Sequence, residues 1–197
     1  MIFDICQIML FLIAVVLLCA ENAIGDEINM RQTWEKARIK PDVTQFSPQN
    51  PLLEYYFFDK VKFGNQLSPN TVFNIPTLLD WPLLAGHFYT IMMIDPDAPH
   101  PKNPIDRNRL HWLVVNIPND HYREGETLVE YRGIIRDKEK SPHRYVTLVY
   151  HQPCEMKFDF QKINSRELKS RANFSVEAFA EKYNFTDLIA GNYFIGS

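Results

Sequence analysis

Cysteine is scarce in this sequence and lies mostly near one end. Of the three cysteines, Cys6 and Cys19 stand close to the N-terminus and Cys154 stands alone in the rest of the chain. Once the N-terminal segment is removed, no intramolecular disulfide can form. We therefore expect a hydrophobic core to stabilise the fold. Cys154 is then a free thiol or an intermolecular one.

Neither sign of charge is in large excess. The formal net charge is -3, and no basic stripe runs along the chain, which argues against a nucleic-acid partner. The sequence has no Gly-x-Ser-x-Gly turn and no His-Glu-x-x-His helix, which removes the strong signals for a serine hydrolase and a zinc protease. With 46% hydrophobic and 23% charged residues, the composition is that of a globular domain. These absences predict a protein that is not an enzyme and needs no cofactor.

No apolar run reaches the length of about 20 residues that spans a bilayer. The longest, Ile8 to Ala20, is followed by small residues and is typical of a secretory signal peptide. We expect residues 1–25 to be this signal, cleaved after Ala20 or Gly25, and residues 26–197 to form one mature domain. An uncleaved signal anchor is the alternative.

Two tripeptides favour export independently. Asn173-Phe174-Ser175 and Asn184-Phe185-Thr186 both match the acceptor pattern for N-glycosylation. Such tripeptides occur often by chance, so their value comes from the signal peptide beside them. Together they predict a secreted, extracellular protein that is glycosylated at Asn173, at Asn184, or at both.

Short apolar runs predict a β-rich fold. The runs His87 to Ile94, Trp112 to Ile117 and Arg144 to His151 are rich in β-branched and aromatic residues, and proline follows each of them closely. Their turn-rich connections favour a sandwich or barrel. Helical spacing is confined to Asp26 to Arg38 and Glu177 to Tyr183, so helices are expected to flank the sheets.

Polar side chains gather where these runs end. Asp95, Asp97 and His111 belong to a proline-stiffened loop between two of the runs, and His143 and Tyr145 open the third with side chains on one face. If two parallel strands begin near His111 and His143, an antiparallel strand ending at Asp95 brings all three to one edge of a sheet. A small-ligand site and a solvated turn with incidental charges both fit this pattern. A metal site matches no strong ligand spacing.

One stretch resembles a known family. Asp95-Pro96-Asp97-Ala98-Pro99, followed by Arg107 and His111, is similar to the signature of the phosphatidylethanolamine-binding proteins, and so is Tyr131-x-Gly133 followed by His143-Arg144-Tyr145. The resemblance spans roughly Trp34 to Phe194. It implies an all-β or α+β fold, a β-sandwich with a large central sheet and a few flanking helices. It also implies a pocket for phosphate-like anions, lined by Asp95, Asp97, Pro99, His111, Gly133, His143 and Tyr145.

The sequence departs from the family pattern around the pocket. Arg109 and Leu110 stand where the family usually has a tryptophan and a histidine. Ile135 stands where a glycine normally lets the backbone approach the anion, so a branched side chain could narrow the mouth. Arg109 and Arg136 could compensate by supplying new positive charge.

The resemblance implies a secreted, non-enzymatic binding protein. Its expected partner is phosphatidylethanolamine or a phosphate-like anion, with peripheral membrane contact in the first case. The alternative is a secreted protease inhibitor or signalling modulator that acts through protein–protein contacts. A hydrolase is the third hypothesis, and no activated nucleophile supports it.

Overall fold

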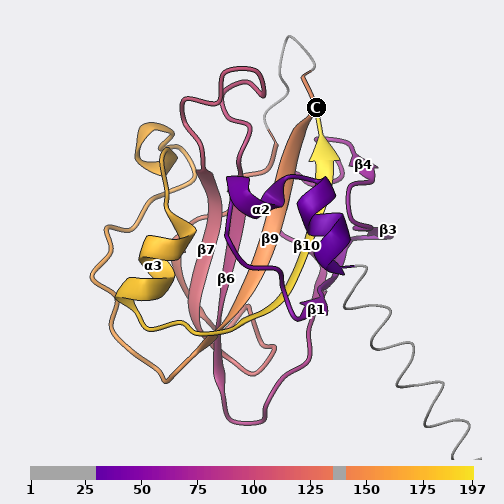
Figure 1. The fold of residues 1–197 in the computed structure, drawn as a ribbon. Coiled ribbons are helices and arrows are strands. Elements are labelled where there is room, and N and C mark those ends of the chain that lie inside the picture. The colour runs from indigo at the N-terminus through magenta and orange to yellow at the C-terminus, as the bar shows by residue number, and fades with distance from the viewer. Residues whose placement is uncertain (1–29, 135–140) are drawn as a thin grey trace, which may run out of the picture.

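The computed structural model describes residues 30–134 and 141–197 (Figure 1). The predicted signal peptide with its two cysteines lies outside these residues, and so do Ile135 and Arg136. Two β-sheets pack face to face, and short helices flank the larger sheet. The predicted fold class is therefore confirmed.

The large sheet has seven strands in the order β1-β10-β9-β6-β7-β8, and β4 pairs with β10. Its strands are β1 (Asn50–Pro51), β4 (Gln66–Leu67), β6 (Phe88–Asp95), β7 (Arg109–Pro118), β8 (Glu126–Val129), β9 (His143–Gln152) and β10 (Leu188–Gly196). The small sheet has three strands in the order β3-β2-β5, namely β3 (Asp59–Lys60), β2 (Leu53–Tyr56) and β5 (Leu78–Asp80).

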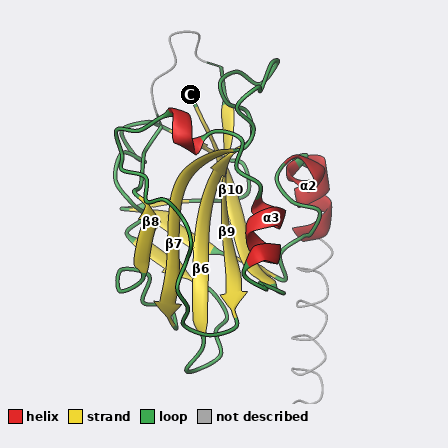
Figure 2. Ribbon diagram, turned by 90° about the vertical axis from the view of Figure 1, so that its left-hand side faces the viewer, coloured by secondary structure: helices red, strands yellow, loops and turns green. Residues whose placement is uncertain are grey.

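The helices are short and lie on one side of the large sheet, as Figure 2 shows for α2 (Ile39–Asp42) and α3 (Val176–Lys182). A helical turn at residues 30–36 precedes α2, and a 3-10 turn, η1, covers Lys169–Arg171. Helix α3 begins where Ser175 Oγ accepts a hydrogen bond from the Ala178 N–H at 3.1 Å. In the part of the chain that the structure describes, no helix is long and apolar enough to cross a membrane.

Strand β6 determines the geometry of the large sheet. It is antiparallel to both β7 and β9, so these two neighbours run parallel to each other. Their first residues therefore lie at the edge where β6 ends with Asp95. Both faces of β6 are buried: Met92 and Ile94 face the helices, while Ile91 and Met93 face the small sheet. This explains why β6 has a continuous apolar sequence instead of an alternating one.

The C-terminal strand β10 is not predicted by the sequence pattern. Gly191 and Asn192 resemble turn signals, yet both serve packing. A Cβ at Gly191 would approach the Trp34 ring to 2.9 Å, so glycine makes room for a buried tryptophan. The Asn192 side chain donates hydrogen bonds to the Leu52 and Val61 carbonyls at 2.8 and 3.1 Å. These bonds fix β10 against the small sheet.

A carboxyl group lies buried between the two sheets. Glu54 on β2 is fully buried, and its Oε1 accepts a hydrogen bond from the Thr147 hydroxyl on β9 at 3.1 Å. Its Oε2 has no hydrogen-bond partner among the described residues. Burial raises the pKa of Glu54 to about 7. The carboxyl group is thus protonated in the folded protein across most of the acidic range.

We predict that Glu54→Gln stabilises the protein at pH 8 and changes little at pH 4. The unfolded chain loses this proton near pH 4.5 and the folded protein near pH 7, so the stability that Glu54 contributes is lost as the pH rises between these values. The gain at pH 8 should be about 2–3 kcal/mol in the free energy of unfolding. Urea denaturation at both pH values measures it, and an equal effect at the two would contradict the assignment.

Candidate functional site

Three strand ends bring a carboxylate and two histidines together. Asp95 ends β6, His143 begins β9, and His111 lies near the start of β7. All three are buried, with exposed fractions of 3%, 8% and 5%. Asp95 Oδ2 lies 2.9 Å from His143 Nδ1 and 3.9 Å from His111 Nε2. The grouping expected at one edge of the sheet is therefore present.

A β-bulge places His111. Met93 pairs with Trp112 and Ile94 pairs with Leu110, which leaves His111 as an extra residue on β7 with no partner on β6. The carbonyls of Leu110 and His111 accept hydrogen bonds from Arg171 Nη1 at 3.1 and 3.0 Å. The guanidinium of η1 thus fixes the bulge that turns His111 toward the site.

Arg171 is itself a buried positive charge. Its side chain is 1% exposed, and its hydrogen bonds to described residues go to carbonyl oxygens, among them those of Glu130 and Asn164. Burial lowers the pKa of Arg171 to about 10, which leaves the group charged at neutral pH. A charged guanidinium therefore lies beside the site. Carbonyl dipoles stabilise it, and among the described residues no carboxylate forms an ion pair with it.

The hydrogen bonds of His111 define its tautomer. Its Nδ1 lies 2.7 Å from the Arg132 carbonyl oxygen, which only accepts, so Nδ1 carries the hydrogen. Its Nε2 is buried and has no hydrogen-bond partner within the described residues. Burial lowers the pKa of His111, and the nearby charge of Asp95 opposes this only in part. Neutral His111 thus presents Nε2 as a group that gains a proton readily when an anion arrives.

Aromatic rings form the floor of the site. The Tyr145 ring meets His111 edge to face at 5.1 Å and stacks on Phe194 at 5.2 Å. Ile134 packs beside Tyr145 over Gly196, since a Cβ at Gly196 would lie 2.1 Å from Ile134 Cδ1 and 3.1 Å from the Tyr145 ring. Burial raises the pKa of Tyr145, so its hydroxyl stays neutral and able to donate.

Asp97 has a different position from the one that the sequence pattern suggests. Its amide donates to Asp95 Oδ1 at 2.8 Å, but its carboxylate faces away, toward Arg144. Oδ2 accepts from the Arg144 backbone N–H and Nε at 2.8 and 2.9 Å, and Oδ1 lies 2.6 Å from Nη2. Burial favours the neutral acid, but these bonds outweigh it and lower the pKa of Asp97. Asp97 therefore acts on the candidate site indirectly, because its amide holds the Asp95 carboxylate in place.

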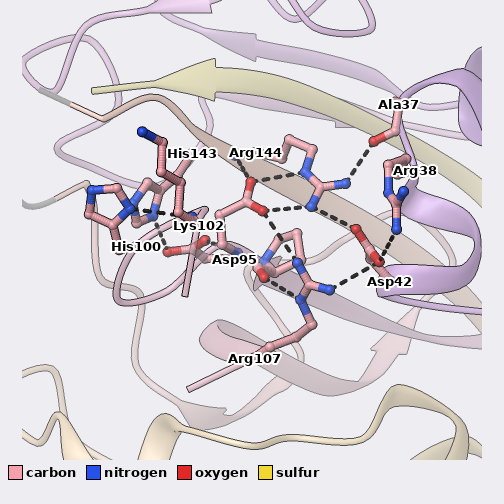
Figure 3. Close-up of polar contacts among 11 residues, drawn as sticks. Ala37, Arg38, Asp42, Asp95, His100, Lys102, Arg107, His143 and Arg144 are labelled. Atoms are coloured by element: carbon pink, nitrogen blue, oxygen red, sulfur yellow. Dashed lines mark hydrogen bonds and ion pairs between the residues drawn. The ribbon is translucent and has the colours of Figure 1, made fainter. Parts of the chain in front are cut away.

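The same arginine joins the rim to the N-terminal segment (Figure 3). Arg144 Nη2 lies 2.9 Å from Asp42 Oδ2 on α2, and Nη1 donates to the Ala37 carbonyl at 2.7 Å. Arg107 lies 3.0 Å from the other oxygen of Asp42 and donates from Nε to the Pro96 carbonyl at 2.6 Å. We call Asp42, Asp97, Arg107 and Arg144 the rim ion-pair network.

The remaining sequence-predicted residues lie around the group and not within it. Pro99 is exposed, and Gly133 is half-buried. A Cβ at Gly133 would lie 2.6 Å from the Val72 carbonyl, so this glycine permits close backbone packing against the segment before β5. Sequence reasoning also misses Ile134, Phe194 and Arg171, because their roles depend on contacts between distant segments.

The geometry suits an anion better than a metal. In the described ranges, no group of three or more His, Cys, Asp or Glu side chains could hold a metal ion. Protonated imidazole N–H groups and a tyrosine hydroxyl are hydrogen-bond donors matched to phosphate oxygens.

Comparison with known proteins gives the same family as the sequence motifs. A family model described as "Phosphatidylethanolamine-binding protein" matches residues 44–194. A putative odorant-binding protein A5 of Drosophila melanogaster is 32% identical over 178 residues, which cover 90% of this chain and 84% of that protein. A 26 kDa secreted antigen of Toxocara canis is 34% identical over 135 residues, or 68% of this chain and about half (51%) of the antigen.

A solved structure shows the same fold. It is a carboxypeptidase Y inhibitor complexed with its cognate proteinase, with a TM-score of 0.75 and 24% identity over 90% of this chain and 98% of that one. The likeness extends over both sheets and is a likeness of fold alone. With the family model matching most of the chain, this protein belongs to the phosphatidylethanolamine-binding protein family.

Proposed function

We propose that the protein is a secreted, non-enzymatic binder of phosphate-like anions, such as the head group of phosphatidylethanolamine. The ligand would occupy the edge formed by Asp95, His111, His143 and Tyr145. One observation supports this most strongly: the buried Nε2 of His111 has no hydrogen-bond partner in the described part of the chain and lies near a buried guanidinium. A buried polar atom of this kind is completed by a ligand.

The charges of the site make such binding favourable. Asp95 accepts from His143 Nδ1, which orients the ring. An anion that arrives would lie near the positive charge of Arg171 in a buried place and would favour protonation of His111, which makes a charge-assisted bond. A phosphate next to Asp95 alone would be repelled. The Asp95 carboxylate would therefore orient His143, and the histidines would contact the anion.

We propose that the protein is exported, and both its sequence and its relatives support this. The Toxocara canis relative is named a secreted antigen, and the fly relative is named an odorant-binding protein. Both sequons of this chain have exposed asparagines, although Phe185 of the second is buried. We propose residues 1–25 as the cleaved signal and Asn173 and Asn184 as glycan sites.

Protease inhibition is the second candidate. Its support is the structural neighbour that was solved with its cognate proteinase. At 24% identity this neighbour supports the fold and does not identify an inhibitory segment in this chain. Anion binding is the preferred proposal because the unpartnered Nε2 of His111 supports it.

We predict that His111→Ala weakens binding of phosphoethanolamine and of inorganic phosphate by about 1.5–3 kcal/mol, or roughly 10- to 150-fold in Kd. The variant removes the ring that would donate to the anion. Isothermal calorimetry measures both ligands, with glycerol, which lacks a phosphate group, as a control that should not bind. His121→Ala is the matched variant, because His121 is exposed and lies outside the site.

If the wild-type protein binds neither anion, the proposed function is wrong. If both are bound and His111→Ala binds them equally well, the function stands and the placement of the site is wrong.

A pH dependence follows from the lowered pKa of His111. In the empty site this histidine is neutral at pH 7.5, and a bound anion favours its protonated form. Sulfate is the suitable probe because its charge is constant in this range. Its affinity should rise as the pH falls from 7.5 toward 5.5, by up to about tenfold per unit for each proton taken up, and then level off. Calorimetry in buffers of different ionisation enthalpy reports the uptake, and His111→Gln should abolish most of it. A pH-independent affinity would contradict this role.

We predict that the secreted protein begins after Ala20 or Gly25 and carries a glycan at Asn173 or Asn184. Mass spectrometry of protein from the medium of a eukaryotic culture determines the N-terminus. Treatment with an N-glycosidase should lower the mass, and Asn173→Gln and Asn184→Gln assign the shift. Recovery of the chain in membranes with Met1 intact would contradict cleavage.

A further inference from the structure

A cavity lies on the face of the large sheet that carries α3. It has a volume of about 540 Å³ and is enclosed by the segment before β1, by α3 and by the start of β10. A volume of this size suits a small organic ligand. The residues that line it are Phe46, Ser47, Gln49, Tyr150, Glu177, Ala180, Glu181, Phe185, Thr186, Asp187 and Leu188.

Aromatic and aliphatic groups form its walls. Tyr150 and Phe185 are 3% and 7% exposed, and their rings lie 6.2 Å apart. Phe46 also lines the cavity, with 63% of its surface exposed. An exposed phenylalanine beside a cavity offers a ring face to a ligand.

The polar lining carries one sign of charge. Glu177 and Glu181 lie one turn apart on α3, and Asp187 comes from the segment before β10. Among the described residues that line the cavity, none is Lys or Arg. Glu177 accepts from the Gln45 N–H at 2.8 Å, and Asp187 accepts from the Thr186 hydroxyl at 2.8 Å, so these two carboxylates are held in place by neutral donors.

One further polar atom on the wall lacks a partner. Ser47 Oγ is buried, and no described residue hydrogen-bonds to it. A hydroxyl accepts as well as donates, so it can complete the coordination of an N–H group that enters the cavity.

We propose that this cavity binds a small organic ammonium ion, with its apolar part against Tyr150 and Phe185 and its charge among the carboxylates of α3 and Asp187. Aromatic faces combined with carboxylates favour alkylammonium groups, because the ring quadrupole and the negative charge both attract the cation. A neutral ligand would gain only the apolar contact, and an anion would be repelled.

This cavity is independent of the anion site. Tyr150 and His143 are seven residues apart on β9, about 23 Å at the rise of a strand. Tyr150 faces the helices, whereas Tyr145 of the anion site faces the small sheet. The two sites can therefore be tested separately, and failure of one says nothing about the other.

Three ligands of similar shape separate the possibilities: phenethylamine is a cation at neutral pH, 2-phenylethanol is neutral and phenylacetate is an anion. Calorimetry and amide NMR of the mature protein should show the amine binding at least about tenfold tighter than the alcohol, with phenylacetate weakest. Amide shifts should be confined to residues 44–49 and 176–188. Equal binding of all three, or shifts centred on His111, would overturn the proposal.

Matched variants test which carboxylates attract the ammonium group. Glu181→Gln and Glu177→Gln should each weaken phenethylamine about two- to fivefold and leave 2-phenylethanol unchanged. Phe46→Ala should weaken both ligands by about two- to fivefold. Glu124→Gln is the control, since Glu124 is exposed and lies outside the cavity. Amine binding that is indifferent to both glutamate variants would also overturn the proposal, and unchanged melting temperatures show that the variants fold.

Discussion

The bond between Asp97 and Arg144 holds together the edge of the sheet that carries the candidate site. Asp97 follows β6 and Arg144 belongs to β9, so their contact fixes the ends of two adjacent strands against each other. The arginine also reaches Asp42 and the Ala37 carbonyl, which joins the N-terminal helical segment to the same point. Removing one partner of a buried pair costs about 3–5 kcal/mol, because the other charge is left unpaired. The positions of Asp95 and His143 depend on this bond.

The neighbouring aspartates Asp95 and Asp97 therefore have different roles. Both carboxylates are buried within one short loop, and an anion site cannot have two uncompensated negative charges in its wall. The rim ion-pair network neutralises Asp97, and hydrogen bonding to His143 occupies Asp95. What remains directed at the site are imidazole rings and the field of Arg171. The acidic signature is thereby compatible with a negatively charged ligand.

The sequence predicts the parts of this protein that depend on local pattern. The strands β6, β7 and β9 are short apolar runs, and their antiparallel order brings Asp95, His111 and His143 to one edge, as expected from their positions at strand ends. The motif-based family assignment is confirmed by the family model. Which of these residues touch a ligand stays a prediction.

Features that depend on long-range contacts escape such reasoning. Gly191 and Asn192 look like a turn until Trp34 and Leu52 are placed beside them. Asp97 looks like a ligand residue until Arg144 is seen to bind both of its oxygens. The bulge at His111 cannot be predicted from the sequence either, because it depends on how β7 pairs with β6. The sequence shows which residue types are present, whereas the pairing of the strands determines which way their side chains point.

The large sheet separates the candidate anion site from the cavity beside α3. Side chains alternate between the faces of β9, so Tyr145 and Tyr150 point to different layers of the molecule. Around Tyr145 lie His111 and His143, with Asp95 and Asp97 nearby, while Tyr150 lines the cavity that also carries Glu177 and Glu181. His143 and Tyr150 are about 23 Å apart along β9, so the two groups of charges act on each other only weakly.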